Sequence, residues 1–125
     1  MTIQEKKTPA VLYICTERSP TAPGLAQQRA ETEGRALARG HNLAIVTTIT
    51  DVFGEPDPRQ RSGWMQVREL AELGAVAVAI MRWPNALSPR HELRYSEIEY
   101  LGRYGCQVRF SWEPLTLMTG RGATR

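Results

Sequence analysis

The chain has 125 residues, of which 42% are hydrophobic and 23% are charged, enough for one domain with its own core and unlike a disordered chain. The formal net charge is +3, and apart from Lys6 and Lys7 every basic residue is an arginine. A net charge of this size attracts polyanions only weakly. Many proteins that never bind nucleic acid have a similar net charge, so the charge alone does not indicate a nucleic-acid partner.

Targeting and metal-binding patterns are missing from the sequence. The N-terminus has no apolar signal segment, and the longest apolar run, residues 75–81, is too short to span a bilayer. Cys15 and Cys106 form no Cys-x-x-Cys pair and have no histidine at ligand spacing. No glycine-rich phosphate-binding motif occurs. These observations predict a cytoplasmic protein with reduced thiols, no membrane contact, no metal and no cofactor.

The first part of the chain predicts two strands around one helix. Residues 1–9 are polar and are expected to form a flexible lead. Residues 10–15 are continuously apolar, which is typical of a strand buried on both faces. Residues 25–39 are rich in Ala, Gln, Glu and Arg and end at Gly40, which predicts a helix. Residues 43–50 are rich in β-branched side chains and predict a second strand.

The second part repeats this alternation. The predicted elements are a polar loop at 51–62, a helix at 63–73, a buried strand at 75–81, a proline-containing loop at 82–90, a helix at 91–104 and a strand at 107–112. The order β-α-β-α-β-α-β predicts a three-layer α/β domain over residues 10–116, with a mainly parallel four-stranded sheet. Residues 117–125 are expected to be a flexible tail. Ligands of such sheets bind beyond the carboxyl ends of the strands.

The three loops at those ends carry a recognisable pattern. The first strand ends in Tyr13-Ile-Cys-Thr-Glu-Arg18, and Gln28 follows in the helix. The second loop has Asp51 and then Arg61-Ser-Gly-Trp64, and the third has Pro84-Asn-Ala-Leu-Ser-Pro89 and then Arg90. In order and spacing these segments resemble the catalytic domain of serine recombinases, the resolvase/invertase family. The resemblance implies a resolvase-like fold.

The resemblance also implies where a nucleophile would lie. Family members use a serine hydroxyl to attack a DNA phosphodiester, and several arginines stabilise the charge that develops on the phosphate. Without a gap, Glu17 takes the position of that serine and Cys15 the position of the motif arginine. With a shift of one residue, Cys15 takes the nucleophile position instead. Neither register keeps both the arginine and the serine.

The third loop departs from the family pattern as well. Asn85 stands in place of the motif aspartate and Ala86 in place of the motif arginine, while Arg90 comes one place late. Arg61 is the clearest phosphate-binding candidate that the resemblance supplies. Gln28, Ser88 and Arg90 are the other candidates for phosphate or DNA contact, and Asp51 and Asn85 are candidate supporting residues.

Several of these residues also have a purely structural interpretation. Cys15 fits a buried strand residue, Arg61 a surface charge that flanks a helix, and Ser88 a turn residue. Asp51 fits a residue that caps or orders its loop. Trp83 lies in the proline-containing loop at 82–90, where it is expected to be exposed and to serve as a contact residue.

The leading hypothesis is a stand-alone resolvase-like domain without catalytic activity, which acts as a regulatory module through protein or DNA contacts. One alternative is a divergent serine recombinase that uses Cys15 or another nucleophile for DNA strand exchange. Another is an α/β domain that binds a small anion or a nucleotide at the same strand ends. Both a monomer and a dimer are compatible with the sequence.

Overall fold

Four strands and their connecting helices account for most of the residues that the structure, a computed structural model, describes: 6–16, 21–22 and 24–112. The strands are β1 (Thr8–Thr16), β2 (Leu43–Val52), β3 (Val78–Met81) and β4 (Gln107–Phe110). The α-helices are α1 (Leu25–Gly40), α2 (Ser62–Glu72), α3 (Pro84–Leu87) and α4 (His91–Arg103), and η1 (Pro58–Gln60) is a 3-10 helix.

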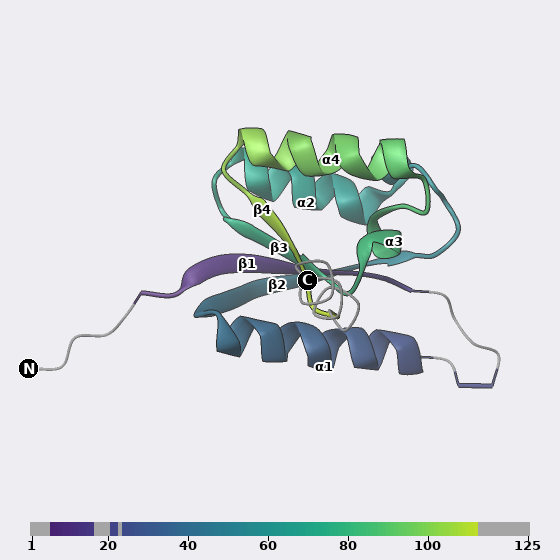
Figure 1. Cartoon of the computed structure of the whole chain (residues 1–125), viewed down its shortest axis with the longest axis horizontal. Coiled ribbons are helices and arrows are strands. Elements are labelled where there is room, and N and C mark those ends of the chain that lie inside the picture. Colours follow the sequence, from purple (N-terminus) through teal and green to yellow (C-terminus); the bar gives the residue numbers. More distant parts are fainter. Residues whose placement is uncertain (1–5, 17–20, 23, 113–125) are drawn as a thin grey trace, which may run out of the picture.

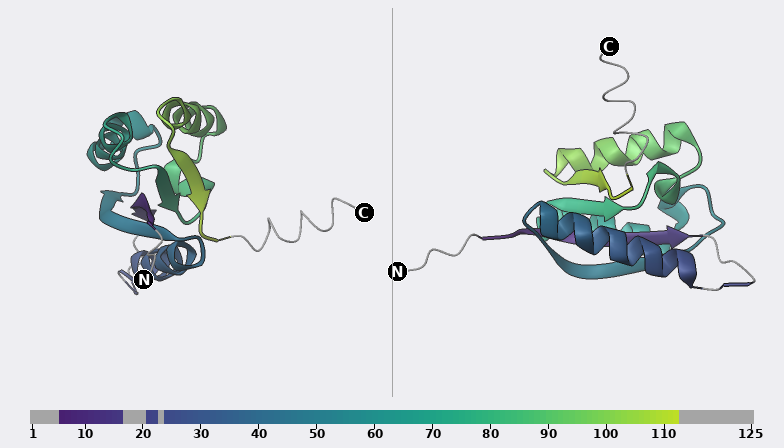
Figure 2. Two further views of the ribbon diagram at one scale, coloured as in Figure 1. Left: turned by 90° about the vertical axis from the view of Figure 1, so that its left-hand side faces the viewer. Right: turned by 60° about the horizontal axis from the view of Figure 1, so that its bottom comes forward.

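The strands form one parallel sheet in the order β2-β1-β3-β4. Helix α1 covers one face, and α2 and α4 cover the other, so the domain has three layers (Figures 1 and 2). The predicted α/β class, the parallel sheet and the alternating order are therefore confirmed. Among the described helices, none has the length and hydrophobicity that a bilayer crossing requires.

Several element boundaries differ from the expected ones: β2 continues to Val52, into the segment expected to be a loop, and β4 ends at Phe110 rather than at residue 112. β1 begins at Thr8, inside the segment expected to be a lead. β3 begins only at Val78, because the Ala75 amide still bonds to Leu70 at the end of α2. The loop expected at 82–90 contains the short helix α3, which starts at Pro84, a residue well suited to a first helical turn.

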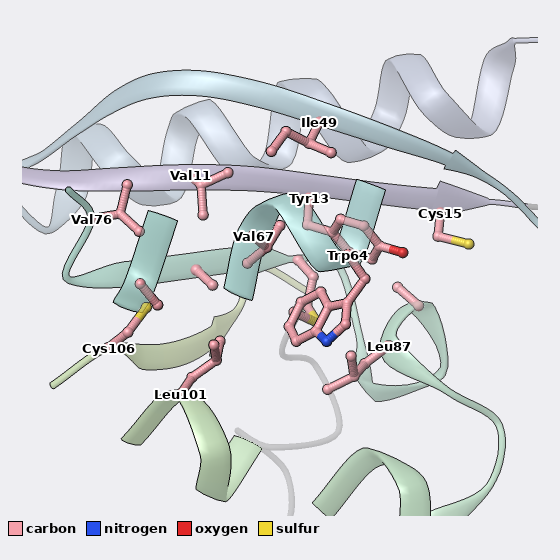
Figure 3. Packing of buried hydrophobic residues seen from close by; sticks show 14 residues of the cluster. Val11, Tyr13, Cys15, Ile49, Trp64, Val67, Val76, Leu87, Leu101 and Cys106 are labelled. Atoms are coloured by element: carbon pink, nitrogen blue, oxygen red, sulfur yellow. The ribbon is translucent and has the colours of Figure 1, made fainter. Parts of the chain in front are cut away.

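The central strand β1 supplies both hydrophobic cores. Ala10, Leu12 and Ile14 face α1, whereas Val11, Tyr13 and Cys15 face α2 and α4 (Figure 3). This two-sided burial explains why the strand reads as a continuous apolar run. Helix α1 lies so close to β1 that a Cβ atom on Gly34 would come within 2.5 Å of Leu12 Cδ1.

A β-bulge at Val46 controls which side chains of β2 face which core. Ala10 pairs with Ile45, but the next residue, Val11, pairs with Thr47, so Val46 is the extra residue. Ile45 packs in the core on the α1 side, whereas Ile49 belongs to the core on the α2 side. The extra residue thus brings odd-numbered positions to the α2 side for the rest of the strand, Asp51 included.

Because Val46 is an insertion in an otherwise regular ladder, its deletion leaves every later side chain of β2 on its present face. We predict that deleting Val46 lowers the unfolding free energy by no more than about 1 kcal/mol, measured by urea denaturation. Deleting Leu12 from the central strand is the matched control. That deletion moves Tyr13 and Cys15 to the wrong face and should prevent folding. Equal damage from both deletions would show that the bulge itself is required.

Candidate functional site

Asp51, at the end of β2, connects three elements at the carboxyl edge of the sheet. Its Oδ2 accepts hydrogen bonds from the Tyr13 hydroxyl at 2.7 Å and from the Trp64 amide at 2.8 Å. Its Oδ1 accepts one from the Gly63 amide at 2.8 Å. Arg61, the N-cap residue of α2, makes no side-chain capping bond, so Asp51 satisfies these amides from a neighbouring strand. The expectation that Asp51 caps or orders its loop agrees with this geometry.

Gly63 allows the carboxylate to approach this closely. A Cβ atom there would lie 2.6 Å from the carboxyl carbon and from both carboxylate oxygens of Asp51. Any larger residue would therefore displace the carboxylate from the first turn of α2. This requirement explains the glycine in Arg61-Ser-Gly-Trp64 without reference to a ligand.

Arg61 is buried, with only 5% of its surface exposed. Its Nε donates to the Glu55 carbonyl at 2.8 Å, and one terminal nitrogen donates to the Ala86 carbonyl at 3.0 Å and to the Tyr13 hydroxyl at 3.2 Å. The guanidinium therefore ties the β2–η1 loop and α3 to the end of β1. The interpretation of Arg61 as a surface charge is wrong.

The Tyr13 hydroxyl bridges Arg61 and Asp51: it accepts a hydrogen bond from Arg61 and donates one to Asp51. Its ring packs edge-on against Trp64, with centroids 5.1 Å apart (Figure 3). Burial raises the pKa of Tyr13 far above its usual value, and the bond to Asp51 raises it further. The phenol is thus a neutral donor and acceptor. We call Tyr13, Asp51 and Arg61 the strand-end network.

Cys15 lies beside this network and is 3% exposed. Burial raises the pKa of its thiol, although the charge of Arg61 acts in the opposite direction. Its interpretation as a buried strand residue agrees with the structure. Cys106 is buried as well, and burial raises its pKa to about 11. Both thiols are therefore protonated near neutral pH.

The third loop packs against the second through Ser88. The Ser88 hydroxyl is fully buried, donates to the Pro56 carbonyl at 2.6 Å and accepts from the Arg90 amide at 3.1 Å. This is the geometry of a turn residue. The Arg90 side chain is exposed, and the exposed Asn85 accepts a hydrogen bond from Arg94. Cys15 and Arg61 therefore lie together, whereas Arg90 stands at the surface.

A pocket of about 470 Å³ opens at the ends of β1 and β2. Its lining includes Thr16, Asp51 and Phe53, together with Gln27 from the first turn of α1. Gln28, the predicted contact residue, does not line this pocket but lines a smaller neighbouring hollow of about 350 Å³ with Leu25 and Glu31. Glu17 lies outside the residues that the structure describes.

Two features of this region were not predicted from the sequence. Glu97 on α4 is buried, accepts a hydrogen bond from Trp64 Nε1 at 2.7 Å and pairs with Arg68 at 3.4 Å. Its spacing of four residues before Leu101 places it on the apolar face of the helix, which is a usable signal. Trp83 is half-buried against Trp112, with ring centroids 5.0 Å apart, so the expectation of an exposed contact residue is wrong.

Metal binding has no support in the described part of the chain. There, no three His, Cys, Asp or Glu side chains lie close enough together to hold an ion. The strand-end network is instead one carboxylate, one phenol and one guanidinium, all engaged with one another or with backbone groups.

Replacing Asp51 tests how much this network contributes to folding. We predict that Asp51→Ala lowers the unfolding free energy by about 2–4 kcal/mol, because three donors lose their acceptor in a partly buried place. Glu31→Ala is the matched control, since it removes a carboxylate that pairs with Arg35 on the exposed surface of α1. Its cost should stay below about 0.5 kcal/mol. Similar costs for the two variants, by urea denaturation, would contradict the network's structural role.

Thiol labelling tests the protonation and burial of the cysteines. We expect both thiols of the native protein to react with a disulfide reagent far more slowly at pH 8 than in denaturing urea. Cys15→Ala assigns the remaining signal to Cys106. Because the pKa of Cys106 is about 11, its thiolate fraction should rise roughly tenfold per pH unit across the alkaline range. Rapid labelling of native Cys15 at pH 8 would instead indicate an activated nucleophile.

Neither a protein-family sequence profile nor a curated protein sequence matches the chain. Solved structures do match its fold. The C-terminal catalytic domain of ISC1926 TnpA, an IS607-like serine recombinase, superposes with a TM-score of 0.71 at 16% identity, covering 93% of this chain and 79% of that one. For the N-terminal catalytic domain of TP901-1 integrase the TM-score is 0.72 at 11% identity, covering 94% and 95%.

A resolvase family site-specific recombinase from Streptococcus pneumoniae gives a TM-score of 0.68 at 14% identity and covers 94% of this chain and 86% of that one. The α/β fold expected from the strand-end motifs thus superposes on several solved serine recombinase structures. The chain has the fold of the serine recombinase catalytic domain.

Proposed function

We propose that the chain is a resolvase-like domain that has lost DNA strand exchange and acts as an interaction module. The observation that carries the proposal is the burial of Arg61. This arginine matches the family motif, yet its described hydrogen bonds go to two backbone carbonyls and to Tyr13. An arginine that stabilises a phosphate must direct its donors at the reacting group. The Arg61 donors whose bonds are described, Nε and one terminal nitrogen, are directed at the protein's own segments.

The nucleophile position supports the same conclusion. In the register that places Cys15 there, the thiol is buried, and burial raises its pKa, so little thiolate is present near neutral pH. An activated cysteine has the opposite properties, namely exposure and a lowered pKa. In the other register, Glu17 replaces the serine, and a carboxylate repels phosphate.

The third loop adds no substitute for the missing arginines. Arg90, one place late in the motif, is exposed, and its amide donates to the buried Ser88 hydroxyl. Losing a single preorganised donor typically costs ~10²–10³ in rate. Loss of the nucleophile together with two arginines leaves no credible path to strand exchange.

Under this proposal, residues 10–116 act as a cytoplasmic module that contacts a protein or DNA through its surface. Exposed arginines such as Arg29, Arg39, Arg90 and Arg103 are available to phosphates. The net charge of +3 supplies only weak attraction. DNA contacts of this kind would be salt-dependent and would carry no chemistry.

A plasmid assay tests the loss of catalysis. We predict that the protein neither nicks nor relaxes supercoiled DNA and forms no covalent protein–DNA adduct on a denaturing gel, even at low salt. Cys15→Ala serves as the paired sample. An adduct formed by the wild-type protein and lost in Cys15→Ala would overturn the proposal in favour of the divergent recombinase.

A gel-shift titration in the same buffers separates the two kinds of module. A DNA shift that weakens steeply with added salt supports phosphate contacts, and the slope reports their number. Absence of any shift at low salt removes DNA as the partner and leaves protein contacts. Arg90→Ala should reduce the fraction of DNA that is shifted. Arg61→Lys should change DNA binding only to the extent that it destabilises the fold.

A further inference from the structure

The edge strand β4 lies beyond the core that α1 covers. That core takes strand residues from β1, β2 and β3 but none from β4. Helix α1 lies mainly against β1 and β2, away from this side of the sheet (Figure 2). Side chains of β4 that point to the α1 side are therefore not packed in that core.

Strand alternation brings three polar side chains together on this face. Phe110 packs against the opposite core, so its neighbours Arg109 and Ser111 point to the α1 side. The Ser111 amide donates to the Met81 carbonyl at 2.9 Å, which continues the parallel ladder and places Ser111 opposite Arg82. Adjacent strands are about 4.8 Å apart, so these three residues occupy neighbouring positions.

Arg82 is positioned from two sides but is not fully engaged. Its Nε lies 2.9 Å from Glu33 Oε1 on α1, and its guanidinium carbon lies 4.4 Å from the centre of the Trp83 ring. Both atoms of the ion pair are buried, yet neither makes a hydrogen bond to a described residue. The pair thus fixes the charge of Arg82 in place and leaves its hydrogen-bonding capacity unused.

The other two side chains are also without partners in the described part of the chain. The Ser111 hydroxyl oxygen is buried and has no hydrogen bond, which costs free energy in a folded protein. Arg109 is half-buried and forms none of the ion pairs among the described residues. Two guanidinium groups, one hydroxyl and the single carboxylate of Glu33 leave this face with one excess positive charge.

We propose that Arg82, Arg109 and Ser111, which we call the β4 site, bind a phosphate group. Guanidinium donors match phosphate oxygens in pairs, and a phosphate has enough oxygens to accept from the serine hydroxyl as well. The β4 site lies at an open edge of the sheet, so a phosphate within a DNA strand fits it as well as a free phosphate does.

This inference names the chemical group that the interaction module recognises and in that sense rests on the proposed function. The two are tested by different readouts, since the β4 site is read from phosphate binding and the loss of catalysis from DNA cleavage. A protein that binds no phosphate and leaves DNA uncut overturns the β4 site alone. A protein that binds phosphate there and cleaves DNA overturns the proposed function alone.

Indole N–H signals in an NMR titration with inorganic phosphate provide the first test. Trp83 contacts Arg82 and packs against Trp112, with ring centroids 5.0 Å apart, so both signals should shift saturably. The signal of Trp64 should not move, because that indole is bound to Glu97 in the opposite core. Chloride at equal ionic strength should leave all three signals unchanged.

Removing the charge of Arg109 tests the assignment of the ligand. Arg109→Gln should raise the phosphate dissociation constant about tenfold, because it removes a charged donor without breaking a described ion pair. Arg35→Gln is the matched control, since Arg35 pairs with Glu31 on the exposed surface of α1. Equal phosphate affinity in the two variants overturns the proposal.

Ser111→Ala separates a binding role from a structural one. The hydroxyl has no described partner, so the variant without phosphate should be at least as stable in urea as the wild type. Its phosphate dissociation constant should nevertheless rise about fivefold. A variant that loses stability and binds phosphate as the wild type does shows a purely structural serine and overturns the β4 site.

A short DNA duplex in place of inorganic phosphate identifies the source of the phosphate group. If the duplex shifts the Trp83 and Trp112 signals, and shifts them less in Arg109→Gln, the β4 site binds the DNA backbone. If only inorganic phosphate shifts them, the site binds a small phosphate compound. A protein whose Trp83 and Trp112 signals respond to neither probe has no β4 site.

Discussion

The guanidinium of Arg61 is the constraint on which the carboxyl end of the sheet depends. A buried charge is costly unless it is hydrogen-bonded, and here Nε and one terminal nitrogen of the guanidinium donate to two backbone carbonyls and a phenol. Each acceptor belongs to a different segment: the β2–η1 loop, α3 and β1. The position of one side chain therefore fixes three segments that are far apart in the sequence.

Tyr13 extends this constraint to Asp51 and to the first turn of α2. Donor and acceptor alternate from Arg61 through Tyr13 to the carboxylate, which then holds the Gly63 and Trp64 amides. Hydrogen bonds in such a chain polarise one another, and removal of any member leaves a buried group without a partner. A network organised in this way is suited to rigidity rather than to binding an incoming phosphate.

The sequence was informative about the fold for physical reasons. The apolar strand runs, the Ala-rich helix before Gly40 and the proline-containing loops are local signals, and most of the predicted elements are present with small shifts at their ends. The bulge at Val46 could not be predicted, because it depends on the pairing of β2 with β1. The face occupied by Asp51 follows from that bulge and was equally hidden.

The candidate site was predicted less completely. Motif spacing brought Cys15, Asp51 and Arg61 into consideration, and these residues lie close together in the structure. Spacing cannot reveal whether an arginine faces solvent or its own backbone, so the burial of Arg61 was missed. The neutral Tyr13 between two charged groups was missed for the same reason, since it lies in an apolar run that a core strand explains.

The Nε–H signal of Arg61 in a ¹⁵N-resolved NMR spectrum tests most directly whether this arginine is structural. If the guanidinium is held by Glu55, Ala86 and Tyr13, the signal is sharp, exchanges slowly with water and does not move when inorganic phosphate is added. The signals of exposed arginines such as Arg29 broaden and exchange quickly in the same sample. A rapidly exchanging Arg61 signal that shifts saturably with phosphate would contradict the account and identify an anion site.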